Sequence, residues 1–572
     1  MSLLEQHFDV AFAAPDGIKK LRELILTLAM QGKLVPQDPN DEPASELLRS
    51  IEADQEWLVK EGKIKKSQKL PIVTKEEQPF KLPKSWIWAR SEYTAQFIDP
   101  QPSHRTPPEY EGGIPYIGYS DIDHIKGINF ANARKVSPEV FEEHRQRYQL
   151  KLGDFVFGKI GTLGQPFFLS EPFEYCLSAN LILIQPNSSI IHPKYLAAFL
   201  DSPSFLNFLD GNKTNSTHGV FGIKKARLIC LPLPPLAEQR RIVAKIDQLM
   251  ARCDELEKLR IDRSQRLLTV HTAALDQLLT AEDSSEFSTA WSFITQHFGE
   301  LYSVKENVVE LRKTILQLAV MGKLVPQDPN DEPASELLRS IELEKQRLVK
   351  EGKIKKSKPL PEIDRQEIPY DLPKEWVWAR LGDISLFSDS GWSPQCLSEP
   401  RSGQEWGVLK VSAVSWGEFR YEENKALPPG IEAKPECEVR VGDFLISRAN
   451  TEELVARSVL VKSSPICLMM SDKIVRFKLS QKIEKEFINF VNLSQFSREY
   501  YASNASGTSS SMKNISREVM NNLPIPFPPL AEQRRIVEKI DRLMGMCDRL
   551  EESISSGKGK QTDLLNALMS QV

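Results

Sequence analysis

Long apolar runs, paired cysteines and an excess of basic charge are all missing from this sequence of 572 residues. No stretch approaches the roughly 18 apolar residues needed to span a bilayer, and no signal peptide precedes the first helix, so we expect a cytoplasmic protein that binds no membrane. The seven cysteines form no Cys-x-x-Cys pair, which argues against a disulfide framework and a zinc site. A net charge of -4 excludes a protein that coats nucleic acid non-specifically, although local clusters and partner subunits could still supply basic charge.

Sequence motifs for catalysis are missing as well. GDFVFGK at Gly153–Lys159 begins like a phosphate-binding loop, but Ile160 stands where the metal-binding hydroxyl belongs. Glu61–Lys63 and its copy resemble a nuclease Glu-x-Lys triplet, which arises easily by chance in a chain with 27% charged residues. All eight histidines lie at or before His297, and neither His-Glu-x-x-His nor an Asn-Pro-Pro-aromatic string for adenine methylation occurs. We therefore expect no catalytic residue, metal site or cofactor site.

An internal duplication organises the chain. GKLVPQDPNDEPASELLRSIE at Gly32–Glu52 recurs unchanged at Gly322–Glu342, an offset of 290 residues. The same offset relates two LVKEGKIKKS strings, at Leu58 and Leu348, and relates LPKSWIWAR to a later LPKEWVWAR. PPLAEQRRIV at Pro234 also recurs, with an offset of 294. Self-similarity of this extent indicates two copies of one structural unit.

The segments between the repeated blocks have diverged. Ser91–Leu231 and Leu381–Ile525 share little beyond a Gly-Asp-Phe string at Gly153 and at Gly442. Equal blocks suggest equal partners, and unequal segments suggest unequal targets. We expect five regions: a helical scaffold at 1–79, a first lobe at 80–233 (lobe 1), a spacer helix with the second scaffold copy at 234–370, a second lobe at 371–527 (lobe 2) and a last spacer helix at 528–572.

Residue spacing predicts a long helix after each lobe. Apolar residues after Pro235 and after Pro529 step by four and three positions, the pattern of a coiled-coil seam. The seam positions are Ile242, Ile246, Leu249, Cys253 and Leu256, and in the copy Ile536, Ile540, Leu543, Cys547 and Leu550. Helices of about 40 residues would be roughly 60 Å long, so an antiparallel pair would form a spacer between the lobes.

The remaining elements are shorter. Amphipathic helices are expected at Ile18–Met30, Ala44–Lys60, Val308–Val320 and Ala334–Lys350, with a Pro-Asn-Asp-Glu-Pro turn inside each pair. Apolar runs bounded by Gly, Pro and Ser predict strands at Asp154–Phe157, Leu181–Ile184, Phe444–Ile446 and Ile474–Leu479. Trp86, Trp88, Trp376 and Trp378 are expected to wedge each lobe against its helices. The predicted fold is α+β: two strand-rich lobes separated by long antiparallel helices in an internal pseudo-two-fold repeat.

This layout resembles the specificity subunits of type I restriction-modification systems over nearly the whole chain. The most specific pieces are the GKLVPQDPNDEPASELL blocks, the LPK-x-W-x-W-AR lobe openings, the PPLAEQRRIV helix starts and SRANTEELV at Ser447–Val455. The resemblance implies that each lobe is a target recognition domain that reads one half of a split, asymmetric site on double-stranded DNA. The repeated helices would set the spacing and bind two modification subunits, which would methylate adenine from S-adenosylmethionine. Motor and nuclease subunits would join for restriction and use ATP and Mg.

Direct readout of DNA needs polar or aromatic side chains on loops, and both lobes contain such segments. Candidates in lobe 1 are Ser103, His104, Arg105, Tyr119, Lys159, Lys213, Asn215 and Thr217. Candidates in lobe 2 are Trp392, Lys410, Trp416, Arg448, Asn450, Thr508, Ser510 and Lys513. Solvated loops without DNA contact explain each segment about as well. The Lys-rich strings at Lys63–Lys69 and Lys353–Lys358 are candidates for phosphate contact or plain solvated helix ends.

Two other classes of protein compete with the DNA-reading hypothesis. A single-chain nuclease or methyltransferase would need a cofactor loop and a paired catalytic constellation, and neither is convincing here. A non-enzymatic coiled-coil scaffold without sequence-specific DNA binding would explain the repeats but gives no reason for two large, divergent lobes with polar loops. Sequence-specific DNA binding by the assembled complex discriminates between these readings.

Overall fold

The computed structural model describes residues 8–49, 70–101, 103, 105–160, 163–212, 220–463, 466–507 and 512–569. It comprises two compact units, with Met1–Asp262 and Lys558–Val572 in unit 1 and Arg263–Gly557 in unit 2. Within the described ranges, no helix combines the length and hydropathy that a membrane span requires.

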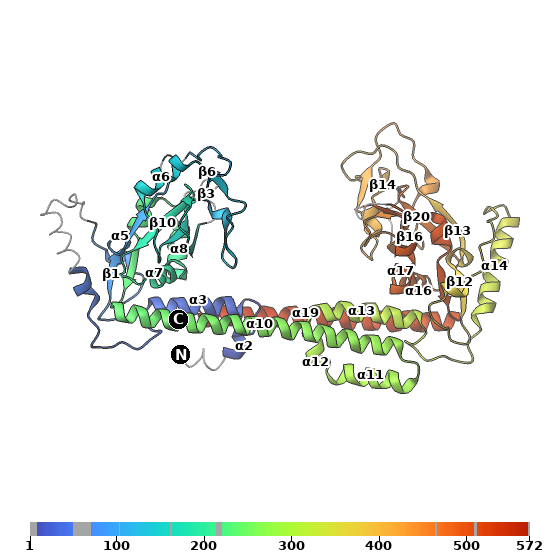
Figure 1. Ribbon diagram of the computed structural model, residues 1–572. Coiled ribbons are helices and arrows are strands. Elements are labelled where there is room, and N and C mark those ends of the chain that lie inside the picture. The colour runs from blue at the N-terminus through green and yellow to red at the C-terminus, as the bar shows by residue number, and fades with distance from the viewer. Residues whose placement is uncertain are drawn as a thin grey trace. The chain divides into compact units, whose positions relative to one another are not determined.

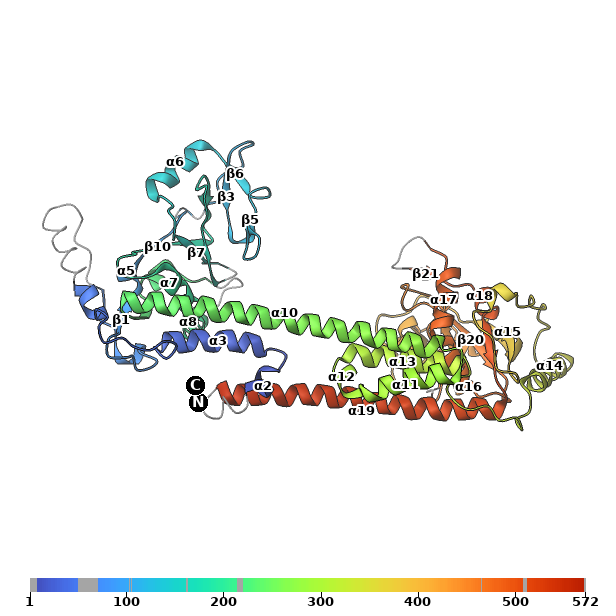
Figure 2. The same cartoon turned by 60° about the horizontal axis from the view of Figure 1, so that its bottom comes forward.

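Unit 1 contains α2 (Phe8–Phe12) and α3 (Gly17–Met30), together with the first part of α10 (Leu236–Thr280) and the end of α19 (Leu530–Met569). Figure 2 shows α3 lying along α10. The Arg22 guanidinium of α3 contacts Asp254 at 2.6 Å and Glu257 at 2.8 Å on α10. The helices expected at Ile18–Met30 and after Pro235 are therefore confirmed. Only the first residues of the helix expected at Ala44–Lys60 are described, and they are helical.

Unit 2 repeats this arrangement with additional helices, which Figure 1 labels. They are α11 (Ser284–Gln296), α12 (Phe298–Leu301), α13 (Lys305–Val320) and α14 (Ala334–Lys350), with the end of α10 and most of α19. Arg312 of α13 contacts Asp548 of α19 at 2.7 Å, which reproduces the contact of Arg22 with Asp254. The two helices expected here are confirmed, and α14 has the expected bounds.

The apolar seam of α10, which was expected to pair with the second long helix, packs in part against α3 and lobe 1. Ile242, Ile246 and Cys253 are buried together with residues of α3 and lobe 1, in a cluster that contains no residue of α19. Leu256 is 48% exposed, so the seam ends one position earlier than its spacing indicates. The apolar side chains of the first turns are covered by the short helix and the lobe.

Lobe 1 consists of small sheets with short helices around them. A four-stranded antiparallel sheet has the order β2-β10-β7-β8, and its strands are Ala95–Ile98, Leu181–Pro186, Phe155–Gly158 and Gly164–Phe168. An outer sheet has the order β6-β3-β9 with strands Arg134–Val136, Ile114–Ile117 and Cys176–Leu177, beside the hairpin of β4 (Ile122–Asp123) and β5 (Gly127–Ile128). The helices are α5 (Ser91–Thr94), α6 (Pro138–Arg147), α7 (Pro193–Leu200), α8 (Pro203–Asn212) and α9 (Ile223–Arg227), with 3-10 turns η1 (Lys75–Glu77) and η2 (Tyr119–Asp121).

Lobe 2 has the same topology. Its four-stranded sheet, β13-β20-β16-β18, is built from Ser385–Ser390, Ile474–Leu479, Phe444–Ser447 and Ser458–Leu460. Its outer sheet, β15-β14-β19, contains Asn424–Ala426, Gly407–Leu409 and Leu468–Met469, and a further pair joins β17 (Ala449–Asn450) to β21 (Lys513–Asn514). The helices are α15 (Leu381–Ile384), α16 (Lys485–Leu493), α17 (Gln495–Asn504) and α18 (Arg517–Asn521), with 3-10 turns η3 (Arg365–Glu367), η4 (Val411–Val414) and η5 (Pro435–Cys437).

In each four-stranded sheet the two central strands are buried on both faces, because most of their residues are apolar. In lobe 1, Phe155 and Ile184 face the helical scaffold, whereas Val156 and Leu183 face an outer apolar cluster. This alternation follows from the two-residue period of a strand. The four expected strands of the two lobes are all present, with shifts of one or two residues at their ends.

The Gly-Asp-Phe string that the lobes share forms the turn before the central strand. Gly153 and Gly442 have φ of 95° and 85°, a conformation that glycine adopts without strain. The carboxylate of Asp154 accepts the backbone N–H of Lys151, and Asp443 accepts that of Arg440. Each following Phe is fully buried. The sequence similarity that survives between the lobes is therefore this turn.

Each lobe is joined to its scaffold by the same two features, which we call a latch: an antiparallel pair formed by the lobe's first and last strands, and a hydrogen bond from a tryptophan to a glutamate of the long helix. Lobe 1 begins with β1 (Ile87–Arg90) and ends with β11 (Cys230–Leu233), which pair antiparallel. The Trp86 indole N–H donates to Glu238 of α10 at 2.9 Å, and burial raises the pKa of that glutamate. Trp88 packs instead against Phe80. Both tryptophans were expected to pack lobe 1 against its helices, and Trp86 takes that position.

The second latch has the same geometry. In lobe 2, β12 (Val377–Arg380) pairs with β22 (Pro524–Phe527). The Trp376 N–H donates to Glu532 at 2.9 Å, and burial raises the pKa of this glutamate too. The α+β fold with two strand-rich lobes and an internal repeat is confirmed.

Candidate DNA interface

Three of the predicted contacts in lobe 1 follow strand β2, in the loop of residues 99–105. Ser103 and Arg105 are exposed. The Gln101 amide donates to the Ser103 hydroxyl at 2.8 Å and to the Arg105 carbonyl, so it fixes the curvature of the loop. His104 lies outside the described residues.

A buried hydrogen-bond chain holds Gln101. The Tyr148 hydroxyl accepts the backbone N–H of Leu177, so its own proton points to Nδ1 of His144 at 2.7 Å. Nε2–H of His144 then donates to Oε1 of Gln101 at 2.7 Å. Burial lowers the pKa of His144 to about 4, which keeps the ring neutral as this chain of bonds requires.

Lys159, which the sequence suggests as a DNA contact, lies inside lobe 1. Its side chain is 6% exposed, and its ammonium is 2.6 Å from the Asp99 carboxylate at the start of the same loop. The Arg147 guanidinium binds the Asp99 carbonyl from α6. Lys159 therefore anchors the loop that carries Ser103 and Arg105, and its charge is already compensated.

Tyr119 lies in η2 at the rim of the outer sheet, half-buried. Its hydroxyl donates to Oε1 of Gln165 at 2.9 Å and lies 3.2 Å from Nε2 of His124. Burial raises the pKa of Tyr119. Sequence reasoning missed Gln165 and His124, because only the fold brings β8 and the β4–β5 hairpin to the tyrosine.

In lobe 2 the short β17–β21 pair brings three predicted residues together. Asn450 on β17 is directly opposite Lys513 on β21, and Arg448 precedes the same strand. Arg448 is exposed, and the Lys513 ammonium donates to the Gly507 carbonyl at 3.1 Å. The Asn450 amide donates to the Ser415 hydroxyl at 3.0 Å. A guanidinium, an amide and an ammonium therefore share one edge of lobe 2.

Trp416 and Lys410 flank η4, next to Ser415. Trp416 is 55% exposed, and the Arg420 guanidinium carbon lies 5.9 Å from its ring centroid. The Lys410 ammonium is 3.6 Å from Glu423. Trp392 lies elsewhere in the lobe, partly packed on the cluster of Val408, Cys437 and Met469, with the Lys434 ammonium 4.6 Å from its ring. Ser415 thus links Trp416 to the β17–β21 edge, and Trp392 is not part of that group.

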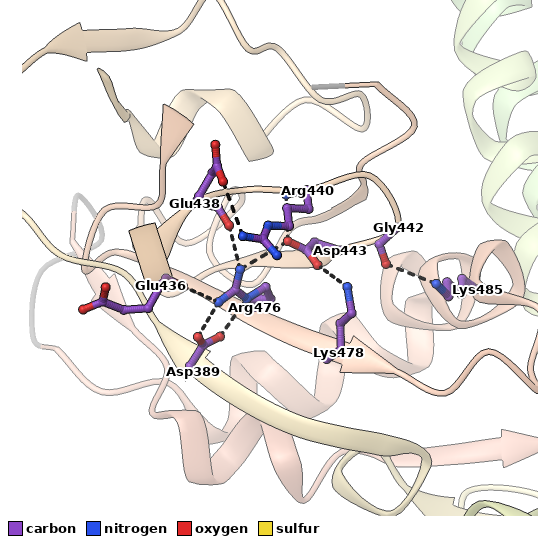
Figure 3. Close-up of polar contacts among 9 residues, drawn as sticks. All are labelled: Asp389, Glu436, Glu438, Arg440, Gly442, Asp443, Arg476, Lys478 and Lys485. Atoms are coloured by element: carbon purple, nitrogen blue, oxygen red, sulfur yellow. Dashed lines mark hydrogen bonds and ion pairs between the residues drawn. The ribbon is translucent and has the colours of Figure 1, made fainter. Parts of the chain in front are cut away.

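Lobe 2 also holds a charged cluster around Arg476, shown in Figure 3. Arg476 of β20 binds both carboxylate oxygens of Asp389, at 2.9 and 2.5 Å, and the carbonyls of Glu436 and Glu438, each at 2.8 Å. Asp443 lies 3.3 Å from Arg476 and 2.9 Å from Lys478. Burial alone would lower the pKa of Arg476, but the hydrogen bonds and charges of the two aspartates outweigh it and raise that pKa.

The corresponding interior of lobe 1 is different. Strand pairing puts Leu183 at the position of Arg476, because each is the partner of the second residue of its central strand. The carboxylate of Asp154, which corresponds to Asp443, accepts a hydrogen bond from the Gln185 amide at 2.6 Å. Burial raises the pKa of Asp154. The two lobes therefore keep one fold with different interior charges.

Several expected contacts fall outside the described residues: Lys213, Asn215, Thr217, Thr508, Ser510 and the string Lys63–Lys69. The second Lys-rich string follows α14, and its lysines are exposed. Among the residues that the structure describes, no group of His, Cys, Asp and Glu could hold a metal ion.

The fold and these surfaces define a protein with two similar domains on a duplicated helical scaffold, each with polar and aromatic side chains on exposed loops. The sequence pattern of the family described as "Type I restriction modification DNA specificity domain" matches residues 104–263 and 373–556, more than half of the chain. The chain therefore belongs to the family of type I restriction enzyme specificity subunits.

Two relatives from Escherichia coli match the chain over most of its length. The EcoEI specificity subunit is 39% identical over 569 residues, which cover 96% of this chain and 93% of the relative. The EcoAI specificity subunit is 36% identical over 575 residues with the same coverages. The solved HsdS subunit from Thermoanaerobacter tengcongensis aligns with a TM-score of 0.40 and 19% identity, covering 85% of this chain and 97% of that chain.

Proposed function

We propose that this chain reads a bipartite, asymmetric site on double-stranded DNA and directs adenine methylation and restriction by partner subunits. Lobe 1, residues 80–233, reads one half of the site, and lobe 2, residues 371–527, reads the other. The observation that carries the proposal is the contrast between identical latches and different lobe surfaces. Two domains of one topology, each attached in the same way, suit the local two-fold symmetry of the duplex DNA backbone, while different side chains let the half-sites differ.

The exposed groups suit direct readout of bases. In lobe 2, Arg448 and Asn450 carry the side chains that bind guanine and adenine edges in the major groove, and Lys410 and Lys513 suit phosphates. Trp416 offers an exposed ring for contact with a base. In lobe 1, Ser103 and Arg105 lie on a loop that buried bonds hold in place. Their hydroxyl and guanidinium can reach base edges without ordering the loop on binding.

The catalytic chemistry belongs to the partners in this proposal. Two modification subunits bind the duplicated scaffold, one on each copy, and methylate adenine from S-adenosylmethionine. Motor and nuclease subunits use ATP and Mg for restriction. The chain itself is non-catalytic, uses no cofactor and works in the cytoplasm, where the host DNA is found. The helical regions at 1–79, 234–370 and 528–572 serve as scaffold and spacer.

The first experiment is to express the chain with the neighbouring modification subunit and map methylated adenines across the host genome. We expect a split motif that appears only when this chain is present. Replacing Ser91–Leu231 with the lobe of a relative should then change one half of the motif and leave the other intact. No motif from an assembled complex would favour the scaffold alternative, and changes in both halves would contradict modular reading.

A further inference from the structure

Gln165 has an unusual backbone conformation at an exposed position of lobe 1. Its φ is 56°, one of only three positive values at non-glycine residues within the described ranges. Pro166 follows it, which restricts the conformations of Gln165 still further. Strained residues of this kind persist where function requires them. The positive φ coincides with the irregular pairing of β7 with β8, and the side chain that it carries is exposed.

The side chain of Gln165 is held from one side. The Tyr119 hydroxyl donates to Oε1 at 2.9 Å, and this bond positions the amide group. Oε1 keeps a second lone pair, and Nε2 has no hydrogen-bond partner among the residues that the structure describes. His124 supports the tyrosine from 3.2 Å, and its ring packs edge-on against Phe167.

Gln165 lies next to the part of lobe 1 that corresponds to the β17–β21 edge of lobe 2. In lobe 1 the chain leaves β7 through a bridge between Ile160 and Val220 and reaches Gln165 on β8. The equivalent bridge in lobe 2 is the β17–β21 pair, which carries Asn450 and Lys513. Gln165 therefore lies at the start of β8, just after the connection whose counterpart in lobe 2, between β16 and β18, bears Arg448 and Asn450.

We propose that Gln165 is a specificity-determining residue of lobe 1, which reads an adenine in the first half-site through its fixed amide, with Tyr119 as its positioning residue. An adenine presents an N6 amino donor and an N7 acceptor in the major groove, and a glutamine amide matches both. The free lone pair of Oε1 accepts from N6, and Nε2 donates to N7. This inference rests on the proposed function and adds a residue and a base to it.

The test uses the full chain in complex with its modification subunits and a DNA library with randomised half-sites. Gln165→Gly removes the amide and relieves the positive φ, so the variant should fold at least as well as the parent. We expect discrimination at one base pair of the first half-site to fall by roughly 5- to 160-fold, with every position of the second half unchanged. Gln165→Glu replaces the donor with an acceptor and should move the preference at that base pair towards cytosine, whose amino group donates.

Tyr119→Phe tests the positioning role, because it keeps the ring and removes the hydroxyl. It should weaken discrimination at the same base pair and at no other. Gln495→Ala is the matched control, since Gln495 is an exposed glutamine of α17 that bonds Glu499 of its own helix. It should leave both half-sites unchanged.

The outcomes separate this inference from the proposed function. A parent complex with no bipartite preference would refute the proposed function. A parent with a clear split motif that both Gln165 variants leave unaltered would overturn only the role of Gln165. Weaker discrimination spread over both halves would also overturn it, because a base-reading residue acts at one base pair.

Discussion

Replacing Arg476 with leucine should destabilise unit 2 by about 3 kcal/mol and leave unit 1 unchanged. Removing one partner of a buried ion pair costs about 3 to 5 kcal/mol, because the other charge stays buried without compensation. The lower end applies here for two reasons. Asp443 keeps the Lys478 ammonium at 2.9 Å, and the Asp389 side chain is 35% exposed, so water can solvate it.

Hydrogen exchange read by mass spectrometry measures this effect strand by strand. The amides of β16 and β20 should exchange with an opening free energy lower by about 3 kcal/mol in Arg476→Leu, whereas β7 and β10 of lobe 1 should keep their protection. Adding Asp389→Asn to Arg476→Leu removes the carboxylate that loses its guanidinium partner and should restore part of the loss. A fall below about 1 kcal/mol, or an equal fall in lobe 1, would refute the reasoning that the pair is buried and local.

Two further predictions concern the latches and the histidine of lobe 1. Trp86→Phe and Trp376→Phe each leave a buried glutamate without one donor, so each should lower the free energy of unfolding by about 1 to 3 kcal/mol. Because the two geometries match, the two losses, measured by hydrogen exchange, should agree within about 0.5 kcal/mol. Clearly unequal losses would contradict equivalent latches. Burial lowers the pKa of His144 to about 4 against about 6.5 in an unfolded chain, so between these values the unfolded state binds more protons, and His144 contributes a loss of about 2 kcal/mol in lobe 1 from pH 7 to pH 5. Burial raises the pKa of Asp201 in the same lobe to about 7, which has the opposite effect, so the contribution of His144 is measured as the difference between the parent and His144→Gln over this pH range. An identical pH response of lobe 1 in the parent and the variant would argue against this assignment.

The helices and central strands follow from the sequence because their signals are local. The bounds of α14 and β20 agree with the expected ones, since a Pro or polar turn precedes each apolar pattern. The end of the seam was wrong at Leu256, because spacing marks an apolar face but does not reveal which element covers it. The topology shared by the lobes could not be predicted, since it depends on which short strands pair across long stretches of chain.

The candidate interface was harder to predict than the fold. Asn450 and Lys513 are 63 positions apart, and only strand pairing puts them opposite each other. Lys159 is a predicted contact, but its ammonium binds Asp99 inside the lobe, a pairing across 60 positions that the sequence does not reveal. Gln165 carries no sequence signal at all. Its candidacy rests on a backbone angle and on a bond from Tyr119, which are properties of the folded chain.

The two halves repeat the attachment of the lobes but differ inside the lobes, and this difference limits which substitutions can change the specificity. Arg476 of lobe 2 and Leu183 of lobe 1 occupy corresponding sheet positions, but neither suits the other lobe. A leucine in place of Arg476 would leave Asp389 unpaired. An arginine in place of Leu183 would be buried in the cluster that contains Tyr148 and Tyr175. Exchange of single interior residues between lobes is therefore costly. Both latches contain the same bond from a tryptophan to a glutamate, and each lobe begins and ends on one antiparallel strand pair. A complete lobe brings its own compatible interior to a standard attachment, so replacement of whole lobes is the route to a new half-site that leaves the fold intact.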